Sequence, residues 1–359
     1  MTTILLFVGG LITLIVGAEF LVRGATRLAA AAGISPLVIG LTIVAVGTAS
    51  PEIAVSLQAA AIGQGDLTLG NVLGSNIFNL LFILGVTAMI RPLVIAEQLI
   101  RLDTPILIGI SLFVYVLAVD GSLRALEGAL LLIGLITYII FVMYQSKRES
   151  KAVQKEYAQE FGEKEKPTRS RTLANIAFVA AGFGMLVIGA RWLVEAAIEI
   201  ARALGISELV IGLTIVAIGT SLPEIATSLI AALKRESDIA VGNAIGSNIF
   251  NLLGVLGLAS VVAPGGIPVA RQVLLLDFLV MLGVAFLCWP ILYVDKQIQR
   301  WEGALLFLSY VIYTTYLLLG ATQSPAILIY SVFALVFVLA AIMIVTRRVY
   351  RTFRNRQLP

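Results

Sequence analysis

The chain has 359 residues, of which 59% are hydrophobic and only 13% are charged, and its mean hydropathy is +1.01. Soluble domains contain about 45–50% apolar and about 25% charged residues, so the composition excludes a water-soluble globule and indicates a membrane protein. The absence of histidine excludes Ser-His-Asp catalysis and histidine-ligated zinc or haem. The single cysteine, Cys288, cannot form a disulfide within the chain.

Long apolar stretches, bounded by charged residues, glycine and proline, divide the chain into candidate membrane spans. About 20 apolar residues suffice to cross the hydrocarbon core as a helix. Because the first stretch lacks a positively charged beginning and a cleavage site, we expect it to be a span and not a signal peptide. The sequence predicts eleven helices, at residues 4–22, 36–62, 68–90, 102–119, 125–144, 173–193, 207–233, 239–262, 272–293, 302–320 and 325–346.

The strongly polar stretch 145–172 separates the fifth and sixth predicted helices and carries eight Lys or Arg and five Glu residues. It is too short and too charged for a folded domain, so we expect a solvated, partly helical linker. Cytoplasmic loops carry an excess of Lys and Arg, and a cytoplasmic linker places 21 of the 25 basic residues on that side. We therefore expect a multi-pass protein of the cell (plasma or inner) membrane with an external N-terminus and a cytoplasmic tail. This placement accounts for the net charge of +4 without a nucleic-acid partner.

The chain repeats itself at an offset of 172 residues. The segment GLTIVAVGTASPEIAVSL at 40–57 matches GLTIVAIGTSLPEIATSL at 212–229 in 14 of 18 positions. The segment GNVLGSNIFNL at 70–80 matches GNAIGSNIFNL at 242–252 in 9 of 11 positions. Because each unit contains five spans, an odd number, the second unit must be inverted in the bilayer. Inverted repeats are typical of secondary transporters, whose substrate site lies where the halves meet.

The predicted fold class is therefore an all-α integral membrane protein of two inverted five-helix repeats, plus a peripheral C-terminal helix. The first repeat is expected at 1–144, with its most similar part at 36–90, and the linker at 145–172. The second repeat is expected at 173–320, with its similar part at 207–262. The extra helix then occupies 321–346, and a basic tail occupies 347–359.

Two glutamates, Glu52 and Glu224, occupy equivalent positions well inside the second and seventh spans. A carboxylate within the membrane is costly, so it is a candidate functional group by default. The alternative is a structural ion pair. However, spans two, three, seven and eight contain no Lys, Arg or His at a similar depth, and a mobile cation is the partner that this leaves.

The residues around each glutamate support a cation site. Pro51 and Pro223 free backbone carbonyls and break the helix, and carbonyls at the end of a half-helix are suitable cation ligands; a plain kink is the alternative. The flanking hydroxyls lie four residues before and after each glutamate and so share its helix face. They belong to Thr48, Ser56, Thr220 and Ser228.

The third and eighth spans add hydroxyl and amide oxygens at a spacing of four residues, from Ser75, Asn79, Ser247 and Asn251. Together with the glutamates they form an all-oxygen set, which suits hard cations such as Ca²⁺ and Na⁺. Soft metals prefer Cys or His. The alternative for such residues is polar contact between helices, which we expect for Asn71, Asn76, Asn243 and Asn248. We also interpret the GxxxG segments at 70–74 and 242–246 as close-packing surfaces.

The paired segments GTASPE and GTSLPE, each followed by GN-x-x-GSNIFN, resemble the two α-repeats of the cation/Ca²⁺ exchanger superfamily, in particular its prokaryotic Na⁺/Ca²⁺ exchanger branch. The resemblance covers about residues 4–320 and implies an ion site built from the second, third, seventh and eighth helices. It implies that Glu52 and Glu224 are the central ligands. It also implies that the first and sixth helices slide across the core. The surrounding ligands that it implies are Thr48, Ser75, Asn79, Thr220, Ser221, Ser247, Asn251 and the carbonyls of Ala45 and Ala217.

The sequence departs from the pattern of this family at two positions. Ala49 stands where the second repeat has Ser221 and where family members often carry a hydroxyl, which makes Ser50 an additional candidate. Asn251 stands where many Na⁺/Ca²⁺ exchangers carry aspartate, which leaves two carboxylates in the site. The number of Na⁺ ions and the identity of the counter-ion therefore stay open.

These features predict a secondary antiporter, not an enzyme, that extrudes Ca²⁺ in exchange for Na⁺ by alternating access. Its partners are then the two ions and membrane lipid, and no cofactor is expected. Exchange of H⁺ for Ca²⁺ at the same glutamates is an alternative, since it requires no histidine. A cation channel would use the same oxygens but requires a continuous pore, and inverted repeats argue against it. An intramembrane enzyme is disfavoured by the lack of histidine and of paired aspartates in the spans.

Overall fold

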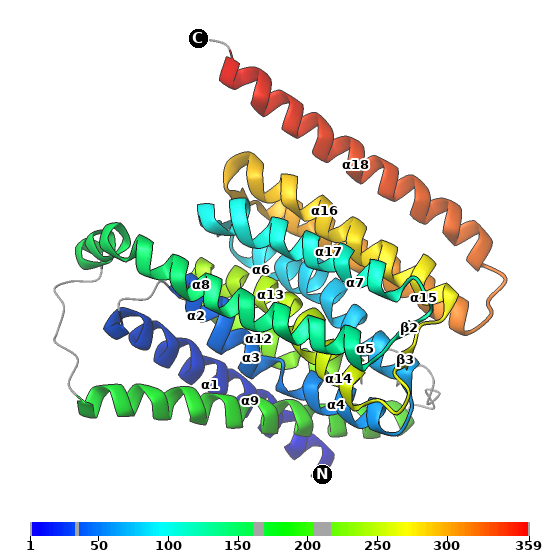
Figure 1. Cartoon of the computed structure of the whole chain (residues 1–359), viewed down its shortest axis with the longest axis horizontal. Coiled ribbons are helices and arrows are strands. Elements are labelled where there is room, and N and C mark those ends of the chain that lie inside the picture. Colours follow the sequence, from blue (N-terminus) through cyan, green and yellow to red (C-terminus); the bar gives the residue numbers. More distant parts are fainter. Residues whose placement is uncertain (1, 33–35, 161–168, 204–216, 358–359) are drawn as a thin grey trace.

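The computed structural model describes residues 2–32, 36–160, 169–203 and 217–357 of the chain (Figure 1). Nearly all of these residues are helical, because a helix satisfies its backbone hydrogen bonds internally and an apolar environment offers no other partners. Nine of the described helices are long and apolar enough to cross a membrane. A tenth span is a helix pair bent by 48° between Leu37–Thr48 and Ser50–Ala61.

The first half of the described chain consists of helices, short π-helical segments (η) within them, and two short strands. In chain order these are α1 (Thr2–Ala32), α2 (Pro36–Ile39), η1 (Gly40–Val44), α3 (Ala45–Thr48), α4 (Ser50–Ala61), α5 (Gly65–Phe78), η2 (Asn79–Ile83), α6 (Leu84–Ile90), β1 (Leu93–Val94), η3 (Leu99–Asp103), α7 (Thr104–Ala118), β2 (Ser122–Leu123) and α8 (Ala125–Glu160).

The second half contains elements in a corresponding order, followed by one further helix. They are α9 (Arg169–Ala203), α11 (Ala217–Thr220), α12 (Leu222–Leu233), α13 (Ser237–Phe250), η5 (Asn251–Val255), α14 (Leu256–Val262), β3 (Ile267–Pro268), α15 (Arg271–Leu275), α16 (Asp277–Asp295), β4 (Gln297–Ile298), α17 (Arg300–Ala321) and α18 (Ile327–Gln357).

Each predicted span has a helical counterpart among the described residues, but several ends differ. For the seventh span only the second part, α11 and α12, is described, since 207–216 lie outside the described residues. Helix α1 continues to Ala32, beyond the expected end at 22. Helix α8 continues to Glu160, through much of the stretch expected to be a linker, because Glu, Lys, Gln and Ala have high helix propensity.

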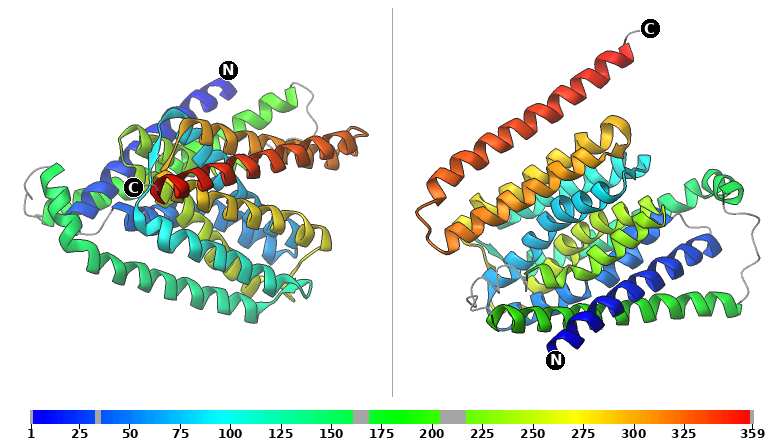
Figure 2. Two further views of the ribbon diagram at one scale, coloured as in Figure 1. Left: turned by 90° about the horizontal axis from the view of Figure 1, so that it is seen from above. Right: turned by 180° about the vertical axis from the view of Figure 1, so that it is seen from behind.

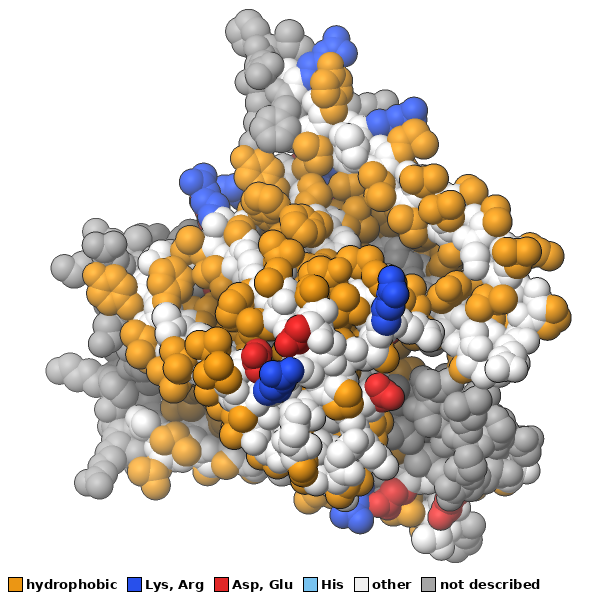
Figure 3. Space-filling model, turned by 45° about the vertical axis from the view of Figure 1, so that its right-hand side comes forward, with side chains coloured by type: hydrophobic (Ala, Val, Ile, Leu, Met, Phe, Trp, Pro, Cys, Tyr) orange, Lys and Arg blue, Asp and Glu red, His pale blue; other side chains and the backbone are white. Residues whose placement is uncertain are grey.

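The helices that follow the two glutamate-bearing segments lie at the centre of the bundle. In α13–α14 and α5–α6, 83% and 72% of the apolar window is buried, compared with 6% for α17 and for α18. Figures 1 and 2 show α18 running along the outside of the bundle. The face in Figure 3 is largely apolar with scattered charged side chains, as expected of a surface that contacts lipid.

Contacts between the halves occur in reciprocal pairs. Strand β1 of the first half pairs antiparallel with β4 of the second, and β2 of the first half pairs antiparallel with β3 of the second. At the centre, Asn76 Nδ2 donates to the Asn248 carbonyl oxygen at 3.3 Å, while Asn248 Nδ2 donates to the Asn76 carbonyl oxygen at 3.1 Å. Equivalent residues of the repeat therefore meet each other across the interface between the halves.

Helices α1 and α9 pack against each other through glycines in register. A Cβ at Gly17 would lie 3.0 Å from the Gly182 carbonyl oxygen, and one at Gly182 would lie 2.8 Å from that of Gly17. Gly10 and Gly189 repeat this arrangement, with corresponding distances of 2.9 and 2.8 Å. Without side chains at these positions the two backbones approach closely, as small residues allow between membrane helices.

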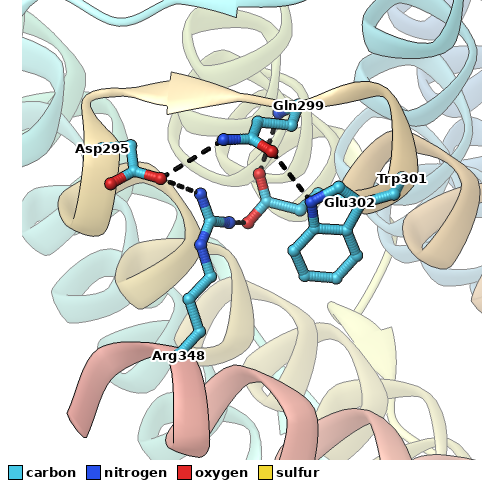
Figure 4. Close-up of polar contacts among 5 residues, drawn as sticks. All are labelled: Asp295, Gln299, Trp301, Glu302 and Arg348. Carbon is cyan, nitrogen blue, oxygen red and sulfur yellow. Dashed lines mark hydrogen bonds and ion pairs between the residues drawn. The ribbon is translucent and has the colours of Figure 1, made fainter. Parts of the chain in front are cut away.

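One arginine contributes a polar attachment of the extra helix α18 to the bundle (Figure 4). Arg348 forms ion pairs with Glu302 at the start of α17 and with Asp295 at the end of α16, and its guanidinium lies 5.2 Å from the centroid of the Trp301 ring. Glu302 is buried and also accepts the backbone N–H of Gln299 at 2.8 Å. Arg348 therefore compensates a buried carboxylate of the second half.

The interpretation of the GxxxG segment at 242–246 as a close-packing surface is supported by the structure. A Cβ at Gly246 would lie 2.7 Å from the Leu41 Cα and carbonyl oxygen, so α13 packs closely against η1. For the equivalent segment 70–74, the matching partner at 209–213 lies outside the described residues.

Candidate cation site

Each segment that carries a glutamate is interrupted by a single residue, which lies two positions before the proline. Helix α3 ends at Thr48 and α4 begins at Ser50; in the second half, α11 ends at Thr220 and α12 begins at Leu222. Pro51 and Pro223 follow directly, and their rings prevent a continuous helix. Each glutamate therefore lies in the first turn of a helix, where the helix dipole favours a negative charge.

Glu52 and Glu224 are both buried, with 1% of their surface exposed. Glu52 Oε1 accepts hydrogen bonds from Ser221 Oγ of the other half at 2.9 Å and from Ser75 Oγ at 3.4 Å. The two carboxylates, one from each half, are close enough for electrostatic repulsion. The fold thus brings together residues that lie 172 positions apart in the sequence.

Neither glutamate has a basic partner among the ion pairs of the described residues. Within the same part of the chain, Oε2 of Glu52 and Oε2 of Glu224 are buried and accept no hydrogen bond. An uncompensated carboxylate in a low-dielectric interior is strongly unfavourable. The arrangement therefore favours occupancy by a cation.

The central helices carry further buried neutral oxygens. Asn79 and Asn251 are 1% exposed, and each begins a π-helical segment, η2 or η5. Such segments are frequent at functional sites. In the described part of the chain, Asn79 Oδ1, Asn251 Oδ1 and Ser247 Oγ are buried and have no hydrogen-bond partner. Three further oxygens are thus available beside those of the glutamates.

Four other predicted site residues form hydrogen bonds with two asparagines of the central helices. Thr48 Oγ1 donates to Asn243 Oδ1 at 3.1 Å, and Thr220 Oγ1 donates to Asn71 Oδ1 at 3.5 Å. Ser56 Oγ and Ser228 Oγ accept the amides of the same two asparagines, at 2.9 and 3.1 Å. These hydroxyls join neighbouring helices, as expected for the asparagines of the GN pairs.

Two predicted residues have other contacts in this structure, and a third is described only by its place in a helix. Ser50 is exposed, and its hydroxyl donates to the Gly47 carbonyl oxygen at 2.6 Å, so it caps a carbonyl that Pro51 frees. The Ala45 carbonyl oxygen accepts the Ala49 N–H at 3.1 Å. Ala217 begins α11, and nothing is described of its side chain.

The site contains two carboxylates and neutral oxygens, with no cluster of three or more His, Cys, Asp or Glu side chains anywhere in the described residues. Sequence reasoning assigned Asn76 and Asn248 to polar contact between helices and did not foresee that they hydrogen-bond to Asn251 and Asn79. Asn76 lies three residues before Asn79, and Asn248 three before Asn251, on the same helix face. This spacing is the signal in the sequence that could have grouped the four asparagines.

Comparison with known proteins identifies the family. A family profile described as "Sodium/calcium exchanger protein" matches residues 2–146 and 174–319. The chain belongs to the sodium/calcium exchanger family. The matched segments cover both halves. They leave out helix α18 and most of the charged stretch that separates the halves. The predicted resemblance and the predicted all-α membrane fold are thereby confirmed.

Two relatives and one solved structure show how similar this exchanger is to others. It is 40% identical over 311 residues to the "Putative antiporter CaxA" of Alkalimonas amylolytica, with 85% of this chain and 95% of the relative covered. It is 32% identical over 336 residues to the "Sodium/calcium exchanger MaX1" of Methanosarcina acetivorans, with 84% and 94% covered. A structure of the sodium-calcium exchanger NCX_Mj soaked with Na⁺ and Ca²⁺ has a TM-score of 0.74 and 29% identity, with 87% and 97% covered.

A more distant relative has a different counter-ion in its name. The "Ca(2+)/H(+) antiporter ChaA" of Bacillus subtilis is 28% identical over 316 residues, with 84% of this chain and 88% of the relative covered. Each of these relatives is named as an exchanger or antiporter, and the counter-ion of Ca²⁺ differs between the names of MaX1 and ChaA.

Proposed function

We propose that this exchanger is a secondary antiporter that extrudes Ca²⁺ in exchange for Na⁺, with Glu52 and Glu224 as the central ligands of one shared site. The observation that carries the proposal is the pair of buried carboxylates, one from each half, with neither ion-paired to a basic side chain in the described residues. Two carboxylates balance the charge of one Ca²⁺, and Na⁺ ions compete for the same oxygens.

The oxygens around the glutamates match what these ions require. Ca²⁺ is coordinated by about six to eight oxygens. Five of the buried oxygens without a partner in the described residues, those of Glu52, Glu224, Asn79, Asn251 and Ser247, would contribute to such a shell, and ion binding would exchange some of the present hydrogen bonds for coordination of the cation. The further ligands that we propose are Thr48, Ser75, Thr220, Ser221 and the carbonyls of Ala45 and Ala217. Ser56, Ser228 and Ser50 lie further out by their contacts.

Alternating access in this proposal is movement of α1 and α9 over the remaining helices. Their glycine contacts make them one unit, which corresponds to the first and sixth helices of the resemblance. An empty site would carry two uncompensated charges through a low-dielectric barrier. Only the loaded site is then free to change sides, which couples the movements of the two ions.

The orientation and the division of the chain are part of the proposal. Two arginines assigned to the cytoplasmic side contact the ends of other helices assigned to that side. Arg91 donates to the Leu233 carbonyl oxygen, and Arg300 donates to the Ile90 carbonyl oxygen. This supports a common side for these loops, and the excess of basic residues favours the cytoplasm. We place the first repeat at 1–144, the cytoplasmic linker at 145–172, the second repeat at 173–320, the extra helix at 321–346 and the cytoplasmic tail at 347–359.

Exchange of H⁺ for Ca²⁺ is the second candidate, favoured by the relative ChaA. The same two carboxylates would release protons when Ca²⁺ binds. The two candidates share the site and differ in the gradient that drives Ca²⁺ movement.

Uptake by liposomes tests the proposed function. Purified protein is reconstituted, and entry of ⁴⁵Ca²⁺ is measured with an outward Na⁺ gradient, with a pH gradient, or with neither. We expect uptake only with the Na⁺ gradient. Uptake driven by the pH gradient alone would support the H⁺ candidate instead, and uptake without any gradient would indicate a channel.

The glutamates are tested in the same assay with Glu52→Gln and Glu224→Gln. We expect each change to reduce uptake about 100-fold, since Ca²⁺ affinity depends on the number of charged ligands. Glu97→Gln is the matched control, because Glu97 is about half exposed and forms ion pairs only with side chains at the surface, those of Arg101 and Lys296, among the described residues. Uptake that survives both site variants would contradict the site assignment.

A further inference from the structure

The two central asparagines, Asn76 on α5 and Asn248 on α13, lie across from each other where the halves meet. Each is 1% exposed. Each side-chain amide donates to the backbone carbonyl oxygen of the other residue, at 3.3 and 3.1 Å. A carbonyl oxygen can only accept a hydrogen bond, so these contacts fix the NH₂ end of both side chains. The orientation of an amide, otherwise ambiguous, is therefore determined here by the backbone.

The opposite ends of these two amides must then be oxygens. Asn248 Oδ1 accepts Asn79 Nδ2 at 2.9 Å, and Asn76 Oδ1 accepts Asn251 Nδ2 at 3.2 Å. If Asn79 or Asn251 were turned over, two oxygens would face each other at hydrogen-bond distance, which is repulsive. The central pair thus determines the orientation of the outer pair.

The consequence lies on the far side of the outer amides. Asn79 Oδ1 and Asn251 Oδ1 are buried without a hydrogen-bond partner in the described chain, and the same holds for Oε2 of Glu52 and of Glu224. A buried amide oxygen without a donor is unfavourable. The hydrogen bonds to Asn76 and Asn248 nevertheless hold both oxygens without a donor. The reversed amides would present NH₂ groups at the same places, and NH₂ groups repel a cation.

We propose that Asn76 and Asn248 are positioning residues that make Asn79 and Asn251 present carbonyl oxygen, and not NH₂, to the transported cation. This inference rests on the proposed function, because it assigns the outer amides to the cation site. The central pair touches no cation itself. It acts through the amide orientation of the neighbours and so sets the affinity for Ca²⁺.

The test replaces the central asparagine by an apolar residue of similar size, in Asn248→Leu. Binding of ⁴⁵Ca²⁺ to the detergent-solubilised full chain is measured by equilibrium dialysis. We expect the dissociation constant to rise about tenfold, the effect of losing one favourable polar contact and exposing the cation to a rotating amide. Gln98→Leu is the control for the loss of a buried amide, since Gln98 is buried and donates to Asp103 at 3.1 Å, outside the proposed site.

A rescue separates positioning from a structural role. Aspartate has oxygen at both ends and no wrong orientation, so Asn79→Asp in the Asn248→Leu background should bring Ca²⁺ affinity back to within about threefold of the unmodified chain. Asn79→Asp alone places an oxygen against Asn248 Oδ1 and should bind Ca²⁺ less tightly than the double variant. A purely structural role for Asn248 predicts no such rescue.

The outcomes distinguish the inference from the function on which it rests. Unchanged Ca²⁺ affinity in Asn248→Leu, or a double variant that binds no better than Asn248→Leu, would overturn the positioning role while the unmodified chain still binds Ca²⁺. Failure of the unmodified chain to bind Ca²⁺ would overturn the proposed function and this inference with it.

Discussion

At the scale of residues, the two halves of the site are similar but not identical. Ser221 donates to Glu52 across the interface between the halves, whereas the equivalent residue of the first half is the buried Ala49. Glu224 therefore has no counterpart of the hydrogen bond that Ser221 donates to Glu52. This difference makes the environment of the two carboxylates unequal and predicts that one part of the site binds ions less tightly.

The change Ala49→Ser should supply the missing hydroxyl. We expect the half-saturating Na⁺ concentration for ⁴⁵Ca²⁺ exchange to fall about fivefold, because one added polar contact contributes about 1 kcal/mol. Ala60→Ser is the control, since Ala60 is also buried but lies about two helical turns beyond Glu52 on α4. An Na⁺ dependence that responds equally to both changes would contradict this prediction.

The repeat indicated that residues of both halves would meet at the glutamates, and Ser75 and Ser221 do donate hydrogen bonds to Glu52. An intramembrane carboxylate is rare enough to be recognised from its position alone. The orientation of the amides of Asn76 and Asn248 could not be predicted, because it depends on backbone carbonyls of the opposite half. The contact of Ser50 with the Gly47 carbonyl was also missed, since a hydroxyl next to a helix break has several acceptors within reach.

At the scale of elements, the glycines between α1 and α9 are the most demanding contact. A Cβ at Gly182 would lie 2.6 Å from the Leu21 backbone nitrogen, and backbone atoms cannot yield without separating the helices. By contrast, Gly184 on the same helix is exposed, and a Cβ there would meet no described atom within 4 Å.

We therefore expect Gly182→Ala to lower the unfolding temperature and to slow Na⁺-driven Ca²⁺ uptake, with a destabilisation of about 1–3 kcal/mol from overpacking. Gly184→Ala should change neither. Thermal unfolding of the purified variants, followed by uptake in liposomes, measures both effects. Equal stability of the two variants would show that α1 and α9 do not pack as described.

The attachment of α18 gives a second prediction at this scale. Arg348→Met leaves the buried Glu302 without its cation, and removing one partner of a buried ion pair costs about 3–5 kcal/mol. We expect a clearly lower unfolding temperature than for Arg354→Met, which changes an exposed arginine of the same helix. Indistinguishable melting curves of the two variants would speak against this anchoring role.

Hydropathy predicted the helices well because length and apolar composition are set by the membrane itself. The short strand pairs β1–β4 and β2–β3 were not predicted, since each strand has only two residues and its partner lies in the other half of the chain. The continuation of α8 into the charged stretch was only partly anticipated, because a polar helix in solvent lacks the apolar periodicity by which spans are recognised.

At the scale of the whole molecule, coupled exchange requires that an empty site does not change sides. Proteoliposomes loaded with ⁴⁵Ca²⁺ should lose little of it into a medium that lacks both Na⁺ and Ca²⁺. Addition of unlabelled external Ca²⁺ should accelerate the loss at least about tenfold, because the returning site is then neutralised. A channel would instead release label at the same rate in both media.

The central claim is that one cation binds between the carboxylates contributed by the two halves. An experimental structure of crystals soaked with Ca²⁺, or with Sr²⁺ for its anomalous signal, tests it most directly. The account predicts a density peak with oxygens of both Glu52 and Glu224 at about 2.3–2.6 Å from the ion. A peak that contacts only one of the two glutamates, or density located elsewhere in the chain, would contradict it.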